Sequence, residues 1–188
     1  MLIPFNLEKT LGQYDQVVSK TKAIVLQKND DYGQSWLLFR PFSMLEQAWI
    51  KIMRIRSIQE KGGVQKIVDE PITQDFLHVI NYSVFGIMLT KEKLKEELTI
   101  DALSEKYDAV VDTVKELYKN KTHDYNEAWR DMAISTMVDI MLSKAVRGKT
   151  MHAKKTDTPE ALFEIFRDIL NYSIFCLIRI EEGTDSLL

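Results

Sequence analysis

Residues 28–36 read KNDDYGQSW, and ninety-three residues later the stretch 121–129 reads KTHDYNEAW. Lys, Asp, Tyr and Trp recur at one spacing in both stretches. At the same offset, residues 14–54 and 107–147 share 12 identities over 41 positions without a gap. Unrelated chains do not agree to this extent, so the chain contains a tandem repeat. The register set by the two stretches decides the fold.

Each repeat predicts three helices, and the first is amphipathic. Apolar residues recur at i, i+3, i+4, i+7 and i+11 from Tyr14, and again from Tyr107. This helix is expected to end near the quoted stretch, where Asp31 and Asp124 are interpreted as capping and turn residues. A second helix is expected over about 43–58 in repeat one and about 135–146 in repeat two.

The third helix opens at Pro71 in repeat one and at Pro159 in repeat two, where the missing N–H of proline costs little. Both helices are apolar nearly all round and carry the related motifs NYSVF (81–85) and NYSIF (171–175). A helix that is apolar on every side belongs at the centre of a fold. The sequence therefore predicts an all-α fold, in which a tandem repeat of a three-helix unit forms one pseudo-two-fold helical bundle.

The repeat register also sets boundaries along the chain. We expect the first repeat unit at 1–90, a connecting segment with the start of the next helix at 91–106, the second repeat unit at 107–181 and a C-terminal tail at 182–188. No signal peptide is recognised, and the most apolar stretch, 161–180, is interrupted by ionisable residues, so a cytoplasmic protein is expected. The net charge of −3 gives no basis for general nucleic-acid or membrane-surface binding.

Several kinds of catalytic or binding site are excluded by their missing motifs. The sequence has no Gly-rich phosphate loop, no Cys/His zinc spacing and no nucleophile elbow. The polar residues of the central helices are therefore the informative ones.

In repeat two, Glu164, Asp168 and Asn171 lie at i, i+4 and i+7, so they share one stripe of an otherwise apolar helix. Burying a carboxylate is costly unless it is paired or bound to a metal. This stripe is a candidate Mg²⁺ site, because hard cations prefer oxygen ligands. The alternative is that the stripe faces solvent or is neutralised by Lys144 and Arg147, and both alternatives stay open.

Repeat one has Gln74, His78 and Asn81 at the corresponding offsets, so it lacks the paired carboxylates. Repeat two is therefore the better candidate for a metal site. A histidine on a buried helix is more often a hydrogen-bonded core residue than a ligand, and His78 is interpreted in that way.

The second helix of each repeat carries an acidic residue, then Lys, then Arg. These residues are Glu46, Lys51 and Arg54 in repeat one, and Asp139, Lys144 and Arg147 in repeat two. Lys and Arg three residues apart lie on one helix face, which suits a polyphosphate. A salt-bridge network within the bundle is the alternative. The segment 148–155 adds three lysines as a candidate phosphate-facing lid.

The order Lys-x-x-Asp-Tyr, then an acidic residue with Lys-x-x-Arg, then a helix with Asn-Tyr, resembles the nucleotide modification associated domain, a domain of unknown function. The resemblance covers residues 14–180 and both copies. That family is in turn similar to the MazG-like all-α nucleoside triphosphate pyrophosphatases, which use clustered Glu and Asp with Mg²⁺. The spacing of Glu164 and Asp168 departs from the MazG-like pattern, and repeat one lacks this pair.

The resemblance and the charge patterns together imply a Mg²⁺-dependent nucleotide-binding protein of MazG-like fold. The implied activity is hydrolysis of a canonical or modified nucleoside triphosphate to the monophosphate and pyrophosphate. Asp139, Glu164 and Asp168 would hold Mg²⁺, and Glu164 and Asp168 would be catalytic. The residues expected to contact the nucleotide are Lys51, Arg54, Asn81, Tyr125, Trp129, Lys144, Arg147 and Asn171.

The competing hypothesis is a non-catalytic helical scaffold that binds a partner or self-associates as a homo-oligomer. It predicts that the repeated charges pair with each other inside the bundle. The residues alone leave open whether the chain is an enzyme and whether one or both repeats carry a working site.

Overall fold

The computed structural model describes residues 6–63, 70–92, 94 and 96–183, apart from the side chains of Tyr32, His123, Asp124 and Tyr125. Six α-helices and two short 3₁₀-helices occur in these ranges, and no strand does. They are α1 (Leu7–Tyr32), η1 (Ser35–Leu38), α2 (Pro41–Glu60), α3 (Ile72–Lys91), α4 (Ile100–Tyr125), η2 (Ala128–Asp131), α5 (Ile134–Ala153) and α6 (Pro159–Glu182). The all-α prediction is confirmed, with α1–α3 in repeat one and α4–α6 in repeat two.

The quoted stretches form the turn that ends the first helix of each repeat. Asn6 is the N-cap of α1 and Thr99 is the N-cap of α4, and each of these side chains accepts a hydrogen bond from the backbone N–H three residues further on. α1 ends at Gly33 with φ of 70°, and α4 ends at Asn126 with φ of 51°. Gly and Asn are the residues that adopt positive φ most readily, so both copies have local chemistry that suits this turn.

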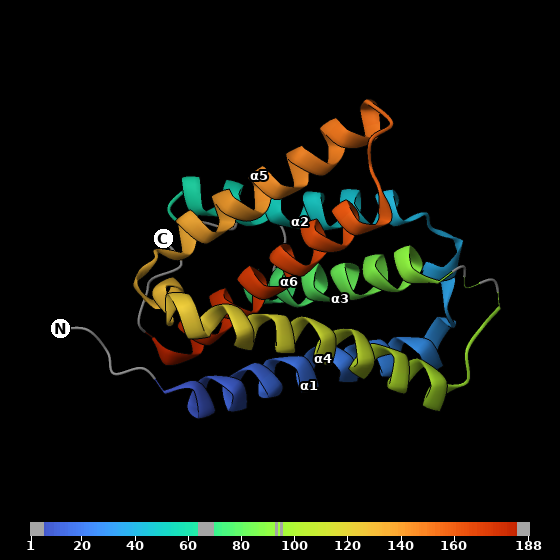
Figure 1. Cartoon of the computed structure of the whole chain (residues 1–188), viewed down its shortest axis with the longest axis horizontal. Coiled ribbons are helices and arrows are strands. Elements are labelled where there is room, and N and C mark those ends of the chain that lie inside the picture. Colours follow the sequence, from blue (N-terminus) through green and yellow to red (C-terminus); the bar gives the residue numbers. More distant parts are fainter. Residues whose placement is uncertain (1–5, 64–69, 93, 95, 184–188) are drawn as a thin grey trace.

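The six helices form three layers of two, and each layer takes one helix from each repeat (Figure 1). α1 lies beside α4, α3 beside α6, and α2 beside α5. The α3–α6 layer lies between the other two. The repeats are therefore interleaved, and they share one core.

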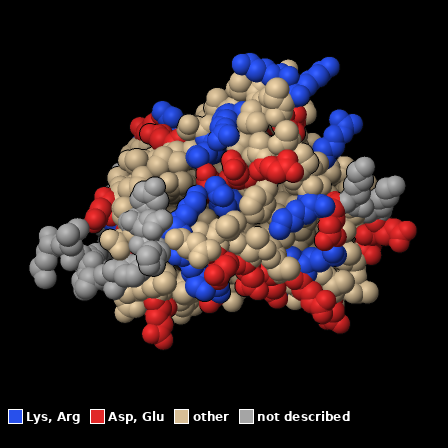
Figure 2. All heavy atoms as spheres, viewed as in Figure 1, with Lys and Arg blue, Asp and Glu red and all other residues tan. Residues whose placement is uncertain are grey.

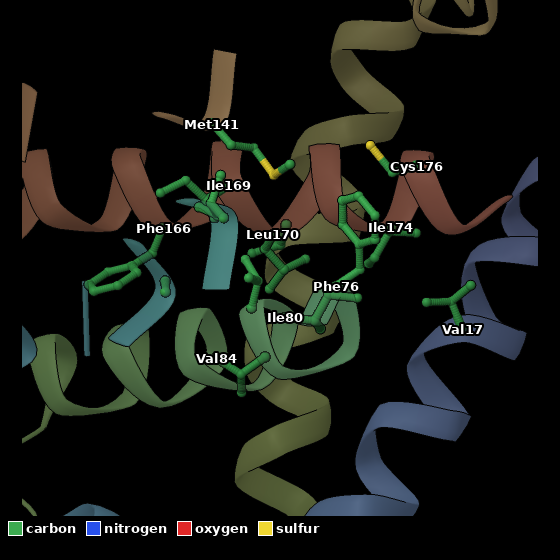
Figure 3. Packing of buried hydrophobic residues seen from close by; sticks show 14 of the residues in the cluster. Val17, Phe76, Ile80, Val84, Met141, Phe166, Ile169, Leu170, Ile174 and Cys176 are labelled. Atoms are coloured by element: carbon green, nitrogen blue, oxygen red, sulfur yellow. The ribbon is translucent and has the colours of Figure 1, made fainter. Parts of the chain in front are cut away.

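That core is built on the two central helices. Ile80 and Val84 of α3 and Leu170 of α6 are fully buried, and Figure 3 shows them side by side, with Met141 of α5 and Val17 of α1 closing the cluster from either side. The expectation that helices apolar all round lie at the centre is confirmed.

The surface carries charges of both signs without a large patch of one sign on the face shown in Figure 2. Within the ranges given above, no helix combines the length and the apolar character that crossing a membrane requires.

One expectation about helix length is wrong. The second helix of repeat two was predicted to end near Val146, with a lid-like loop over 148–155, but α5 continues as helix to Ala153. Gly148 does not end it, because this glycine is buried against Leu45 of α2, whose Cδ2 would lie 2.4 Å from an added Cβ. The glycine thus allows α2 and α5 to approach closely.

A similar close approach joins the central helices and gives a testable prediction. A Cβ added at Gly86 of α3 would lie 2.3 Å from Cζ of Phe166 on α6. We expect Gly86→Ala to lower the free energy of unfolding by about 1–3 kcal/mol through overpacking. Gly12→Ala is the control, because nothing lies within 4 Å of its added Cβ, and it should raise stability by about 0.5–1 kcal/mol. Urea unfolding measures both, and equal effects would contradict the packing argument.

Candidate functional site

Two buried tyrosines join the repeats through reciprocal hydrogen bonds. The Tyr14 hydroxyl of α1 donates to Asn171 Oδ1 of α6 at 3.1 Å, and the Tyr107 hydroxyl of α4 donates to Asn81 Oδ1 of α3 at 2.8 Å. Burial raises the pKa of both tyrosines, so both hydroxyls keep their protons. Asn81 and Asn171, which were predicted to contact a nucleotide, therefore connect the repeats.

Charged residues at corresponding positions also exchange partners between repeats. The pairs are Lys22 with Asp108 at 2.6 Å, Lys115 with Asp15 at 2.7 Å, Arg56 with Asp139 at 3.3 Å, and Lys149 with Glu46 at 3.1 Å. The second of these ion pairs corresponds to the first, and the fourth corresponds to the third. In each case the basic residue comes from one repeat in the first ion pair and from the other repeat in the second. The acidic position shared by Glu46 and Asp139 thus faces a basic residue of the other repeat.

Lys51 and Arg54, predicted to bind phosphates, are held by an acidic residue of their own repeat. Lys51 Nζ lies 3.1 Å from Oδ1 of Asp75, and Arg54 pairs with the other oxygen of that carboxylate. Arg54 also donates to the backbone carbonyl of Glu70 at 3.0 Å. Asp75 is fully buried, so this cluster neutralises a charge inside the bundle. Ile165 stands at the corresponding position of repeat two.

The three carboxylates predicted to hold Mg²⁺ are not brought together. Asp168 is bound by Lys144 Nζ at 2.8 Å and by Arg167 at 2.8 Å, Asp139 pairs with Arg56, and Glu164 is exposed. Among the described residues, no group of three or more His, Cys, Asp and Glu side chains could hold a metal ion. As arranged, these residues do not fit a metal centre. The neutralised-stripe alternative describes Asp168, with Lys144 as its partner.

Three further residues were predicted to contact the nucleotide. Arg147 is exposed. Trp129 is buried, with Phe175 stacked 4.4 Å from its ring centroid and the Arg130 guanidinium carbon 4.5 Å from it. The residue is only 6% exposed, so this indole is not open to a base. The side chain of Tyr125 lies outside the described part of the chain.

Repeat one contains a cavity of about 180 Å³ that the sequence analysis did not anticipate. We call it the repeat-one cavity, and it lies between the end of α1, η1, α2, α3 and the start of α4. Its polar lining residues are Lys28, Asn29, Ser35, Gln47, His78, Asn81 and Tyr82, and the others are Val25, Gly33, Trp36, Phe39, Met44, Phe85 and Leu103. Its lining thus combines the first quoted stretch with the Asn-Tyr motif of α3.

One of the lining residues, His78, has unused hydrogen-bonding capacity. Nδ1 of His78 is buried without a hydrogen-bond partner. Burial, with the nearby charges of Lys28 and Lys51, lowers the pKa of His78, so its imidazole is neutral at pH 7. Lys28 is exposed at the rim. The interpretation of His78 as a satisfied core histidine is therefore wrong, because the side chain is half-buried and one ring nitrogen is unpaired.

A comparison of the repeats could have located this cavity. Val25 and Gln47 of repeat one correspond to Tyr118 and Ile140 of repeat two. Val25 is smaller than its counterpart, and Gln47 is more polar than its counterpart, so the two differences together indicate a cavity. They can be combined only when both residues are known to face the same space.

The buried cluster around Asp75 gives a prediction about stability. We expect Asp75→Asn to lower the free energy of unfolding by about 3 kcal/mol, because two basic side chains would lose their buried counter-charge. Asp139→Asn is the matched control, since its side chain is 62% exposed and surface pairs contribute at most about 1 kcal/mol. Urea unfolding at pH 7 measures both variants. A larger loss for Asp139→Asn would contradict the structural role of the Asp75 cluster.

The Asp168 carboxylate predicts how stability responds to acid. Burial alone would raise its pKa, but the hydrogen bonds and charges of Lys144 and Arg167 outweigh burial and lower it below the ordinary value of 3.8. A lowered carboxyl pKa contributes stability above the unfolded-state value, and this contribution is lost as the pH falls below that value through the folded-state pKa. Asp168→Asn should therefore be less stable at pH 7 and lose less stability between pH 5 and about pH 2. Glu164→Gln on the same helix should keep the wild-type acid response in urea unfolding, and an unchanged response of Asp168→Asn would contradict the pairing.

Comparison with known proteins supports the repeat and its family. The family described as nucleotide modification associated domain 1 matches the chain twice, over residues 28–89 and 121–180. Each match begins at the lysine of a quoted stretch and runs through the second and third helices of its repeat. No curated protein and no solved structure matches the chain. Since the two matches span well over half of its length, the chain belongs to the nucleotide modification associated domain 1 family, with two copies of the domain in tandem.

Proposed function

We propose that the protein binds a nucleotide through repeat one, with the ring of the base in the repeat-one cavity and the phosphates outside it, near Lys28. The observation that carries this proposal is the cavity itself, which places polar side chains, Gln47 and His78 among them, beside an aromatic wall. The family description, which associates the domain with nucleotide modification, supports the same class of ligand.

The size of the cavity limits what it can hold. A cavity of about 150 Å³ accommodates benzene in another protein, so one of about 180 Å³ suits a single ring system. A whole nucleotide does not fit, and its sugar and phosphates would lie at the surface. Most ligand sites combine such an apolar hollow with a few polar groups that fix orientation.

Two polar side chains suit the edge of a base. A neutral imidazole has one donor and one acceptor nitrogen, and His78 lines the cavity, so its ring can bond the edge of a base. Gln47 lines the same cavity and offers both an amide donor and an acceptor. Leaving such groups unpaired costs free energy, and a ligand that bonds them recovers that cost.

Lys28 supplies the charge that a phosphate requires. It is exposed at the rim of the cavity, and among the described residues no hydrogen-bond or ion-pair partner occupies it. An unpaired ammonium beside a ring-sized hollow suits a base with a phosphate attached to its sugar.

Hydrolysis with Mg²⁺ is not part of the function proposed for this arrangement. Asp168 is already bound by Lys144, and Asp139 by Arg56, so the predicted ligands do not form a site. The reciprocal contacts support the scaffold hypothesis for the repeated charges, together with a pseudo-two-fold relation of the repeats. A cytoplasmic location completes the proposal.

Equivalent lysines of the two repeats provide the test. Lys28→Ala should weaken the binding of nucleoside triphosphates and monophosphates about fivefold, because one phosphate-facing charge is worth about 1 kcal/mol at an exposed site. Lys121→Ala, at the corresponding exposed position of repeat two, should leave affinity unchanged. Isothermal titration calorimetry with a panel of canonical and modified nucleotides, at low and at 0.5 M salt, measures both variants.

His78→Phe tests the cavity itself, since it removes the unpaired nitrogen without leaving a void. We expect at least about tenfold weaker binding, in line with the cost of one lost hydrogen bond to a buried group. No binding of any nucleotide to the wild-type chain, or equal loss in Lys28→Ala and Lys121→Ala, would overturn the proposal.

A further inference from the structure

The two repeats hold the same tryptophan–phenylalanine pair in the same geometry. Trp36 stacks on Phe85 with ring centroids 4.4 Å apart and an interplanar angle of 7°. Trp129 stacks on Phe175 at 4.4 Å and 8°. The four residues occupy corresponding positions, so the surroundings of one pair indicate what the other pair can bind.

In repeat two, a tyrosine ring of the protein lies against this pair. The Tyr118 hydroxyl accepts a hydrogen bond from Trp129 Nε1 at 3.2 Å, and its ring centroid lies 5.1 Å from that of Phe175. The Tyr14 ring stacks on it from another side, at 6.2 Å. Both the aromatic wall and the indole N–H of repeat two are therefore used.

In repeat one, the corresponding position is Val25, which lines the repeat-one cavity. A valine has no ring to place against Phe85 and no oxygen to reach the indole. Within the described part of the chain, Trp36 Nε1 has no hydrogen-bond partner. The space that Tyr118 fills in repeat two is thus part of the hollow in repeat one.

A second difference between the repeats closes the region of repeat two that corresponds to the repeat-one cavity. Leu103 of α4 lines the repeat-one cavity, and the corresponding residue, Thr10 of α1, lies beside the equivalent region of repeat two. The Thr10 hydroxyl accepts a hydrogen bond at 2.7 Å from Arg130, which stands where repeat one has Leu37. Arg130 also pairs with Glu182 at 2.8 Å, so this wall of repeat two is held shut.

We infer that Tyr118 is a built-in occupant of the second site, and that its pose defines the ligand of the first. The repeat-one cavity takes a planar ring that lies against Phe85 and carries an oxygen acceptor for Trp36 Nε1. Among nucleobases, those with a carbonyl oxygen reproduce the Tyr118 oxygen, and adenine offers a ring nitrogen as acceptor instead. This inference deepens the proposed function. The identification of the ligand as a nucleotide rests on that function, whereas the binding of a planar ring does not.

Variants at Val25 test the inference without a nucleotide. Val25→Tyr should fill the repeat-one cavity as Tyr118 fills its counterpart, so the variant should fold with a Tm equal to or above that of the wild type. The indole signal of Trp36 in a ¹⁵N–¹H spectrum should shift, because its N–H gains an acceptor. Val25→Phe should keep the Tm and leave that signal close to its wild-type position.

Val18→Tyr is the matched control, since Val18 is buried on the same helix two turns earlier and does not line the cavity. The same increase in volume should lower its Tm by about 3–10 °C, because overpacking costs about 1–3 kcal/mol. A fall in Tm for Val25→Tyr as large as that for Val18→Tyr would overturn the inference.

The probe is p-cresol, the side-chain analogue of tyrosine. It should bind the wild-type chain at one site, shift the Trp36 indole signal, and fail to bind Val25→Tyr. Tyr118→Val should bind two molecules of p-cresol and recover part of its lost Tm when p-cresol is added. Uridine and guanosine should then bind the wild type more tightly than Val25→Tyr, because the introduced tyrosine ring would occupy their site.

The outcomes separate this inference from the proposed function. Nucleotides that bind wild type and Val25→Tyr equally would overturn the inference and the placement of the base in the repeat-one cavity, but they would leave nucleotide binding elsewhere on the chain in place. Binding of p-cresol that Val25→Tyr abolishes, without binding of any nucleotide, would support the ring site and overturn the proposed function.

Discussion

The fold depends on the exchange of a hydrogen bond between a tyrosine of one repeat and an asparagine of the other. Tyr14 and Tyr107 are fully buried, and a buried hydroxyl without a partner would cost about 1–3 kcal/mol. Their partners, Asn171 and Asn81, lie on the central helices of the opposite repeats. Either repeat alone would lose both tyrosine–asparagine hydrogen bonds. The two copies therefore form one folding unit, although each copy can be recognised separately in the sequence.

The same exchange explains why charges recur in both copies. Identity between two repeats can reflect duplicated chemistry or a duplicated contact. Glu46 and Asp139 each face a basic residue of the other repeat, Lys149 and Arg56, so an acidic residue is needed at both positions for pairing alone. Lys51 and Lys144 are both bound to carboxylates, but those carboxylates, Asp75 and Asp168, stand at different offsets in the two copies. The basic position recurs in both repeats because each lysine neutralises a buried or half-buried carboxylate, although the acidic partner lies at a different offset.

The sequence predicted the helices and their register because helical periodicity and repetition are local patterns that need no coordinates. The prediction was wrong at the end of α5. Gly148 does not end this helix, and a larger residue at this position would clash with Leu45. The sequence also proposed a metal site from a stripe on one helix, because a helical wheel shows Asp168 but not the Lys144 that reaches it from α5. The repeat-one cavity depends on five elements meeting at one place, which periodicity does not specify.

The asymmetry of the two copies follows from the different demands of stability and binding. A hollow lined by unpaired groups lowers stability, whereas a ring that fills it and bonds the indole raises stability. A single copy can have either the open hollow or the ring that fills it, but not both. With two copies in one core, repeat two can pack Tyr118 against Phe175 and fix its wall through Arg130, while repeat one keeps Val25 and the cavity. Because the copies are joined through Tyr14 and Tyr107, the stability gained in the filled repeat also supports the open one.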